Sequence, residues 1–345
     1  MRRIVVTVVI VAAVLMAEAT PASAHSVAGS GGTNFKTTLR AVTPPLAGLR
    51  VAVIEGGSRI EVAYSGGKTL YVLGNANEQF LRIDRRGVFQ NLNSPWTYVT
   101  KTRDGVAPPG NANPRKAPDW DKISDGRVAR WHDHRVHWMG DVDPPAVRRS
   151  PERRHVIQPD WNITISDGTT TAIAHGDLVW LPGPSPAPWF LLAAALFAAM
   201  VAIGLWLRPF LPVAAAGAAL IVVDMAHAYA IGFANVGSVA AQLGQTFAAS
   251  IVSIPGWMIG AGGIWLLLRR RTDGFFALVF TGLIAAVVGG MADLNNLSKS
   301  QIEFALASGW ARPIVATSLG LGFGVAAASA LAIRRLEASR PEDPE

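Results

Sequence analysis

The chain contains no cysteine, and this absence removes several kinds of site at once. An exported domain without cysteine has no disulfide framework, so it must rest on an ordinary hydrophobic core. Thiolate zinc sites, iron–sulfur clusters and blue-copper centres all require cysteine ligands. Any metal bound by this protein is therefore held by histidine, carboxylate or methionine side chains, or by the amino terminus.

Charge is also sparse, since charged residues make up 16% of the chain and the formal net charge is +7. The arginines are scattered or lie at the edges of apolar segments, so the basic balance does not indicate nucleic-acid binding. No Ser-His-Asp arrangement, nucleotide-binding loop or carboxylate pair stands out. We therefore expect no nucleic-acid partner, and no common catalytic motif indicates an enzyme.

Residues 1–24 have the three parts of a secretory signal peptide. Arg2 and Arg3 form a charged beginning, an apolar run extends from Ile4 to Met16, and Ala22-Ser23-Ala24 is a small-x-small cleavage site. Cleavage after Ala24 would leave His25 as the first residue of the mature protein. We therefore expect the region that follows to be exported.

Residues 25–181 are predicted to form an all-β extracytoplasmic domain. Short β-branched or aromatic runs alternate with glycine-containing turns, which is typical of a β-sandwich of immunoglobulin-like or cupredoxin-like kind. The runs that we interpret as strands are Leu49–Ile54, Arg59–Tyr64, Thr69–Leu73, Phe80–Ile83 and Asn162–Ile165.

After a proline-rich linker at 182–188, the composition changes to that of an all-α transmembrane domain at 189–335. Five apolar segments, each long enough to cross a hydrocarbon core of ~30 Å, lie near 189–207, 210–233, 243–268, 274–294 and 311–333. Arginines follow the first, third and fifth segments, and the positive-inside rule assigns those ends to the cytoplasm. We therefore predict a multi-pass plasma-membrane protein with a cytoplasmic tail at 336–345.

The stretch from Trp131 to Met139 holds three of the seven histidines. In an extended chain His132 and His134 project to the same face, because side chains alternate with period two. His137 would lie on the opposite face and would join them only across a bulge or turn. We interpret these residues as part of a metal site. The alternative is a structural role, with the imidazoles bonded to the backbone.

A further ligand is predicted at His25, which would complete the favoured site with His132 and His134, because a free amino group on a histidine offers two nitrogen donors. Amine and imidazole nitrogens suit copper, which heads the affinity order of the divalent ions. Asp133 and Asp141 are candidates for orienting an imidazole from outside the metal. Met139 is a candidate soft ligand for Cu(I).

An amino-terminal histidine exposed by signal cleavage on an exported β-domain resembles the periplasmic copper-resistance proteins of the CopC type. The pairing of that histidine with Trp131-His132-Asp133-His134 also resembles the soluble copper domain of the particulate methane monooxygenase B subunit. The resemblance implies that His25, His132 and His134 are copper ligands. The overall layout is similar to signal-bearing membrane proteins of high-GC Gram-positive bacteria, which implies no particular activity.

The membrane segments contain polar residues that such segments normally avoid. Asp224 and His227 are three residues apart and so share a helix face, while Asp293 ends the fourth segment and Arg312 begins the fifth. Ionisable groups at membrane depth usually face the interior of the bundle. These four residues are predicted to form a proton or metal relay, or alternatively a structural ion-pair cluster.

The favoured interpretation is a membrane-anchored extracytoplasmic protein that captures copper for tolerance or delivery. Its partners would be the copper ion, the lipid bilayer and an envelope protein that handles copper. One alternative is a copper-dependent oxidase or monooxygenase that uses the same histidines. Another is an envelope interaction protein without a metal.

We predict that the exported protein begins at His25, because the cleavage site Ala22-Ser23-Ala24 directly precedes it. N-terminal sequencing or intact mass of the membrane-extracted protein measures this directly. A first residue other than His25 would remove the amine ligand and contradict the copper interpretation in this form.

Overall fold

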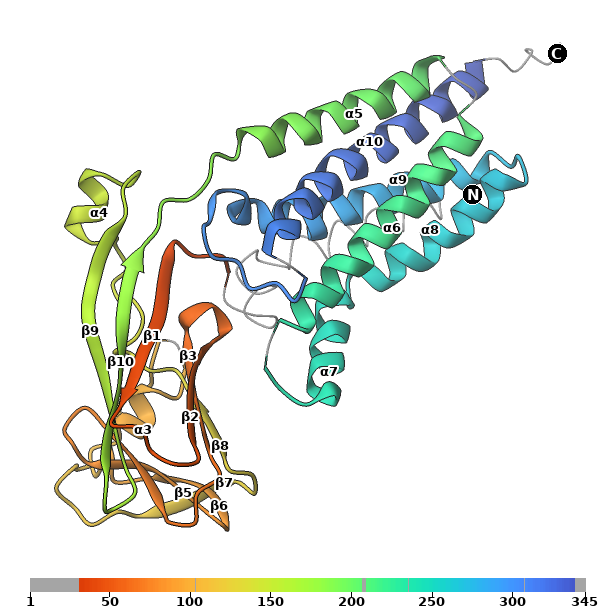
Figure 1. Cartoon of the computed structure of the whole chain (residues 1–345). Helices are drawn as coiled ribbons and strands as arrows, with labels where there is room; N and C mark the ends of the chain where they lie inside the picture. Colours follow the sequence, from red (N-terminus) through yellow and green to blue (C-terminus); the bar gives the residue numbers. More distant parts are fainter. Residues whose placement is uncertain (1–30, 103, 207–208, 235, 307, 339–345) are drawn as a thin grey trace. The chain divides into compact units, whose positions relative to one another are not determined.

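The computed structural model describes residues 31–338 apart from 103, 207–208, 235 and 307. The chain divides into two units, which we call the β unit (33–183) and the helical unit, formed by 184–338 together with 31–32. Both units are drawn in Figure 1. Three predicted features lie outside the described residues: the signal peptide predicted at 1–24, His25, and residues 339–345 of the predicted cytoplasmic tail.

The β unit contains two antiparallel sheets. The larger has the order β1-β10-β9-β4-β5-β6-β7 and the smaller the order β2-β3-β8. The strands are β1 (Phe35–Thr43), β2 (Leu49–Ile54), β3 (Arg59–Tyr64), β4 (Leu70–Leu73), β5 (Gln79–Asp84), β6 (Gly87–Asn91), β7 (Trp120–Ser124), β8 (Val128–Trp131), β9 (His155–Ser166) and β10 (Thr171–Trp180). The short helices α3 (Trp96–Val99) and α4 (Pro145–Arg149) lie between strands.

One hydrophobic core joins the two sheets, and β4, β10 and the second half of β9 bury alternate side chains in it. In β9 the buried residues are Trp161, Ile163 and Ile165, with less buried residues between them. The smaller sheet contributes Ile60, Val62, Tyr64, Ala129 and Trp131 to the same cluster. The turn that carries the histidines thus begins at a residue fixed in the core.

The helical unit contains four helices long and apolar enough to cross a membrane, or five if a bent pair counts as one span. They are α5 (Ala187–Trp206), α6 (Phe210–Gly232), α9 (Asp273–Ile284) with its continuations η2 (Ala285–Gly290) and η3 (Met291–Ser298), and α10 (Ala311–Ala338). Residues 308–310 form a single turn before α10. The predicted third segment, at 243–268, is not one straight helix. It consists of α7 (Val239–Ser250) and α8 (Ser253–Leu268), which meet at 68°.

Glycine allows these helices to approach closely. A Cβ at Gly282 of α9 would lie 2.5 Å from the carbonyl oxygen of Gly322 in α10, so neither position tolerates a side chain without a shift. α5 lies alongside α10 (Figure 1). A second cluster of buried apolar side chains is formed by α5, α6, α8, α9, η2 and α10.

Candidate functional site

The three clustered histidines lie in a turn, not on a strand as predicted. β8 ends at Trp131, and residues 132–138, which we call the histidine turn, have no strand structure. The backbone N–H of Val136 donates to the carbonyl of Asp133 at 3.0 Å, which closes the turn. The period-two argument for His132 and His134 therefore does not apply.

Asp133 holds this turn in place. Its fully buried carboxylate accepts hydrogen bonds from the indole N–H of Trp131 at 2.7 Å, from the backbone N–H of Arg135 at 3.0 Å and from two guanidinium nitrogens of Arg135 at 2.7 and 2.8 Å. Burial acts to raise the pKa of Asp133, but the hydrogen bonds and charge of Arg135 outweigh it and lower the pKa below its ordinary value. The carboxylate is therefore committed to Arg135 and Trp131, not to an imidazole.

Backbone carbonyls orient two of the imidazoles. Nδ1 of His132 lies 3.2 Å from the carbonyl oxygen of Ser58, and Nδ1 of His137 lies 3.0 Å from that of Asp133. Because a carbonyl oxygen only accepts, each Nδ1 carries the proton, and the lone pair of the neutral ring lies on Nε2. Metal-ligating histidines usually have this arrangement. Asp133 thus orients the imidazole of His137, but it does so through its backbone carbonyl and not through the side chain.

His134 and His137 are the two histidines that the turn brings together. Their ring centroids are 5.4 Å apart in an edge-to-face arrangement, and Trp96 of α3 lies 6.1 Å from His134. Nε2 of His134 is buried and has no hydrogen-bond partner among the described residues. An unsatisfied nitrogen in a buried position costs free energy unless a ligand occupies it.

The described residues do not contain a group of three histidine or carboxylate side chains arranged to hold a metal. A complete site would thus need a further ligand, and His25 lies outside the described residues. β1 leads toward the turn, since Phe35 stacks on Trp138 at 6.2 Å and the Thr37 hydroxyl donates to the carbonyl of Val136.

The other candidates in the β unit do not join the pair. Met139 is 42% exposed and Asp141 is also exposed, so neither is fixed against the turn. His155 bonds to the carbonyl of Ser150 at 2.8 Å. His175 bonds to Asp160 at 2.9 Å.

The helical unit buries three of the four predicted polar residues: Asp224, His227 and Asp293. Nε2 of His227 in α6 lies 2.9 Å from a carboxylate oxygen of Asp293 in η3, and both side chains are less than 10% exposed. Asn296 donates to Asp293 at 2.8 Å, and the backbone N–H of Gly32 donates to Asn296 at 3.0 Å. The segment before β1 therefore contacts the end of the bundle that holds this pair.

Asp224 lies in a separate environment, although it is also buried. The indole N–H of Trp257 in α8 donates to its carboxylate at 2.7 Å. A Cβ at Gly289 would lie 2.6 Å from the other carboxylate oxygen and 3.3 Å from the hydroxyl of Ser318. Gly289 belongs to the π-helical segment η2, and such segments occur frequently at functional sites.

Arg312 at the start of α10 donates to the carbonyl of Lys299, and its Nε is buried without a hydrogen-bond partner in the described part of the chain. The structure thus joins His227 to Asp293 and places Asp224 and Arg312 in other contacts. Trp257 and Ser318 were not predicted, because both depend on how α8 and α10 pack against α6. Only the glycine pair Gly289-Gly290 marked the irregular segment in the sequence.

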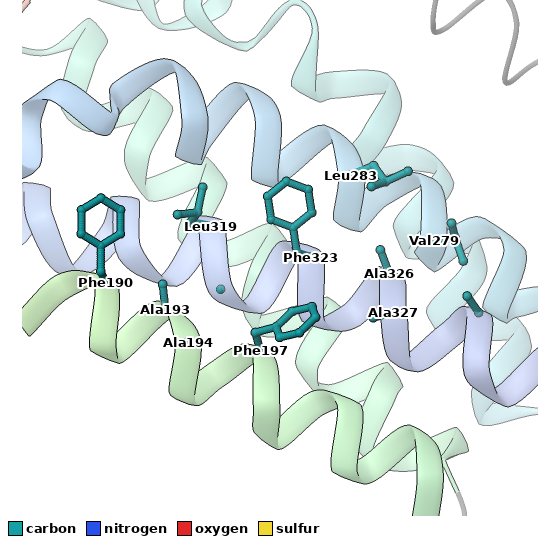
Figure 2. A pocket seen from close by; sticks show the side chains of 12 residues that line it. Phe190, Ala193, Ala194, Phe197, Val279, Leu283, Leu319, Phe323, Ala326 and Ala327 are labelled. Carbon is teal, nitrogen blue, oxygen red and sulfur yellow. The ribbon is translucent and has the colours of Figure 1, made fainter. Parts of the chain in front are cut away.

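A groove of about 620 Å³ opens between α5, α9 and α10 (Figure 2). Its lining is apolar, with Phe190 and Phe197 from α5 and Phe323 from α10 among the larger side chains. None of the predicted site residues lines it. The groove is suited to apolar chains and offers no chemistry for an ion.

The comparisons with known proteins give no relative: no family model, curated protein or solved structure matches this chain. The function is therefore argued from the two clusters described above.

We predict that Asp133→Asn lowers the free energy of unfolding by about 3–5 kcal/mol at neutral pH, because it leaves the largely buried guanidinium of Arg135 without its counter-ion. The pKa of Asp133 is lowered in the folded state, so its contribution is complete above the ordinary carboxyl pKa and is lost as the pH falls through the folded value. Chemical unfolding followed by tryptophan fluorescence should show that the difference in unfolding free energy between the natural protein and the Asp133→Asn variant becomes smaller in acid.

The matched control is Asp141→Asn, which removes the same charge from an exposed residue in the same region and should change stability by less than about 0.5 kcal/mol. Equal effects of the two substitutions would contradict the anchoring role of Asp133.

Proposed function

We propose that this protein is a membrane-anchored, extracytoplasmic copper-binding protein that captures copper for tolerance or delivery. The observation that carries the proposal is the histidine turn. Carbonyl oxygens fix the Nδ1 atoms of His132 and His137, and the buried Nε2 of His134 has no hydrogen-bond partner in the described residues. Histidine nitrogens of this kind suit copper, and no thiolate competes with them.

The proposed ligands are His134, His137 and the amino-terminal His25, with His132 as the alternative to His137. Ten Cα–Cα steps separate His25 from Phe35, so this stretch can extend over roughly 33 Å, and Phe35 stacks beside the turn at Trp138. His25 is therefore within reach of the pair. Bound copper would act here as cargo held by imidazole and amine nitrogens, and the two sheets with their shared core favour the sandwich interpretation of the supporting domain.

The proposed topology places the β unit outside and the carboxyl terminus inside. Cationic residues gather at one end of the helical unit: Arg335 of α10 donates to the carbonyl of Gly204 near the end of α5, and Arg270 after α8 lies over the ring of Phe210 at the start of α6. By the positive-inside rule this end is cytoplasmic. Gly32 contacts the opposite end at Asn296, which is consistent with export of the N-terminal region.

A second role is proposed for the helical unit, because buried ionisable groups in membrane segments are costly. His227 and Asp293 lie at the end that Gly32 contacts. Asp224 lies three residues before His227 in α6, beside the π-helical segment. Together they are proposed to form a polar path that receives an ion or proton from outside. Arg312 would bound this path at the outer end.

For copper, we predict one Cu(II) site with nitrogen-dominated electron paramagnetic resonance in the purified full chain. The His134→Ala/His137→Ala variant should weaken binding roughly tenfold or more, because it removes both described ligands. An extra residue placed before His25 should weaken it similarly, and His132→Ala tests the alternative ligand. Affinity is measured by competition with a chelator of known strength.

His155→Ala/His175→Ala is the matched control, since it removes two histidines of the β unit that bond to other protein groups. It should leave copper affinity unchanged. Retention of full affinity in the His134/His137 variant, or equal loss in the control, would exclude the proposed site.

For the helical unit, we predict that Asp224→Asn and His227→Ala alter cellular copper content and lower copper tolerance at normal protein abundance. Each substitution removes an ionisable group from the proposed path. Asp273→Asn is the control, because Asp273 is a partly exposed residue at the start of α9. Normal copper handling at normal abundance would refute the path, whereas reduced abundance of both variants would indicate a structural role.

A further inference from the structure

Four arginines form a compact basic patch on the β unit. Arg148 and Arg149 end α4, and Arg153 and Arg154 follow within five residues. All four are exposed. Among the described residues, these four arginines form one ion pair, between Arg153 and the exposed Glu152 at 3.7 Å. An exposed pair at this distance is too weak and too well screened to neutralise the patch.

The patch is fixed to the end of the β unit from which the chain leaves. The indole N–H of Trp180, the last residue of β10, donates to the carbonyl of Pro151 at 3.0 Å. His155, which pairs with Trp180 in the sheet, bonds to the carbonyl of Ser150 at 2.8 Å. The backbone between the two arginine pairs is therefore tied to the start of the linker, while Val147 anchors α4 in a buried position.

The linker sets how far this patch can lie from the membrane. Six residues, Leu181 to Pro186, separate Trp180 from Ala187, where the first candidate span begins. At about 3.5 Å per residue they extend over at most roughly 25 Å. Covalent connection alone thus keeps the arginine patch close to the surface of the bilayer that α5 enters.

We propose that the arginine patch binds the phosphate groups of anionic phospholipids at that surface. Guanidinium groups bind phosphate oxygens through paired hydrogen bonds, and clustered arginines gain further wherever anionic lipids make the surface potential of the outer leaflet negative. This binding requires no metal and would hold the end of the β unit next to the bilayer. It is independent of the copper proposal, because none of the four arginines belongs to the histidine turn.

The β unit provides a matched control at the other end of β9. Arg85 lies in the β5–β6 hairpin, and Lys122 of β7 approaches Gly87 of the same hairpin. The hairpin is linked to the end of β9, because β5 pairs with β4 and β4 pairs with β9 at Ser166, its last residue. The arginine patch instead adjoins His155, the first residue of β9. Arg85→Gln/Lys122→Gln therefore removes two positive charges far from the patch.

The test uses the full chain in nanodiscs of phosphatidylcholine with or without phosphatidylglycerol. Since the chain has no cysteine, Val142→Cys beside α4 carries a single donor dye, and acceptor-labelled lipid headgroups report its distance by energy transfer. Transfer should rise when phosphatidylglycerol is present and fall toward the phosphatidylcholine value at about 1 M salt, where the screening length is about 3 Å.

Arg148→Gln/Arg149→Gln and Arg153→Gln/Arg154→Gln should each lower the ratio of docked to undocked protein roughly tenfold in phosphatidylglycerol. The Arg85→Gln/Lys122→Gln control should leave this ratio unchanged. Equal transfer in both lipids, insensitivity to salt, or an equal loss in the control would overturn the proposal. The lipid and salt comparisons use the unsubstituted patch, so they test the binding of the patch to anionic lipid even if an arginine variant fails to fold.

Discussion

The buried ion pair between Asp133 and Arg135 is the interaction on which the histidine turn depends. The Asp133 side chain is fully buried and the Arg135 side chain is only 15% exposed, so the pair is stable because the geometry is bidentate and Trp131 supplies a further hydrogen bond. The same residue uses its carbonyl to close the turn at Val136 and to orient His137. One aspartate thus connects the core strand β8 to the ring positions of the proposed copper site.

Local sequence signals predicted part of the β unit well. β2 and β3 begin and end at the predicted residues, because each is a short β-branched run bounded by glycines or a turn. The extended form of the histidine segment was wrong, because the Asp133 side chain accepts from the backbone N–H two residues later. The residues Asp133-His134-Arg135 allow such a turn in the sequence. The contact between His134 and His137, however, depends on the hydrogen bond from the Val136 N–H to the Asp133 carbonyl that closes the turn.

Apolar length likewise predicted helices able to cross a membrane, of which the described residues contain four, or five if the bent pair counts as one span, but it did not predict their irregularities. The break between α7 and α8 lies close to Pro255-Gly256, a pair that disfavours one continuous helix through the segment. Burial of Asp224, His227 and Asp293 follows from the cost of charge at membrane depth. The hydrogen-bond partners of these residues cannot be predicted in the same way, since the contact of Asp224 with Trp257 requires α6 and α8 to pack at one particular register.

The bend between α7 and α8 also affects how the protein fits bilayers of different thickness. α8 has 16 residues and α10 has 28, so at about 1.5 Å per residue they extend over roughly 24 and 42 Å. The apolar part of α10, between Arg312 and Arg334, extends over roughly 32 Å and so matches a hydrocarbon core of ~30 Å, whereas α8 alone is shorter than that core. In a bilayer, lipids next to α8 would compress, or α7 would tilt inward to complete the span. Hydrophobic mismatch confined to one side of the bundle would make the orientation of this protein sensitive to membrane thickness.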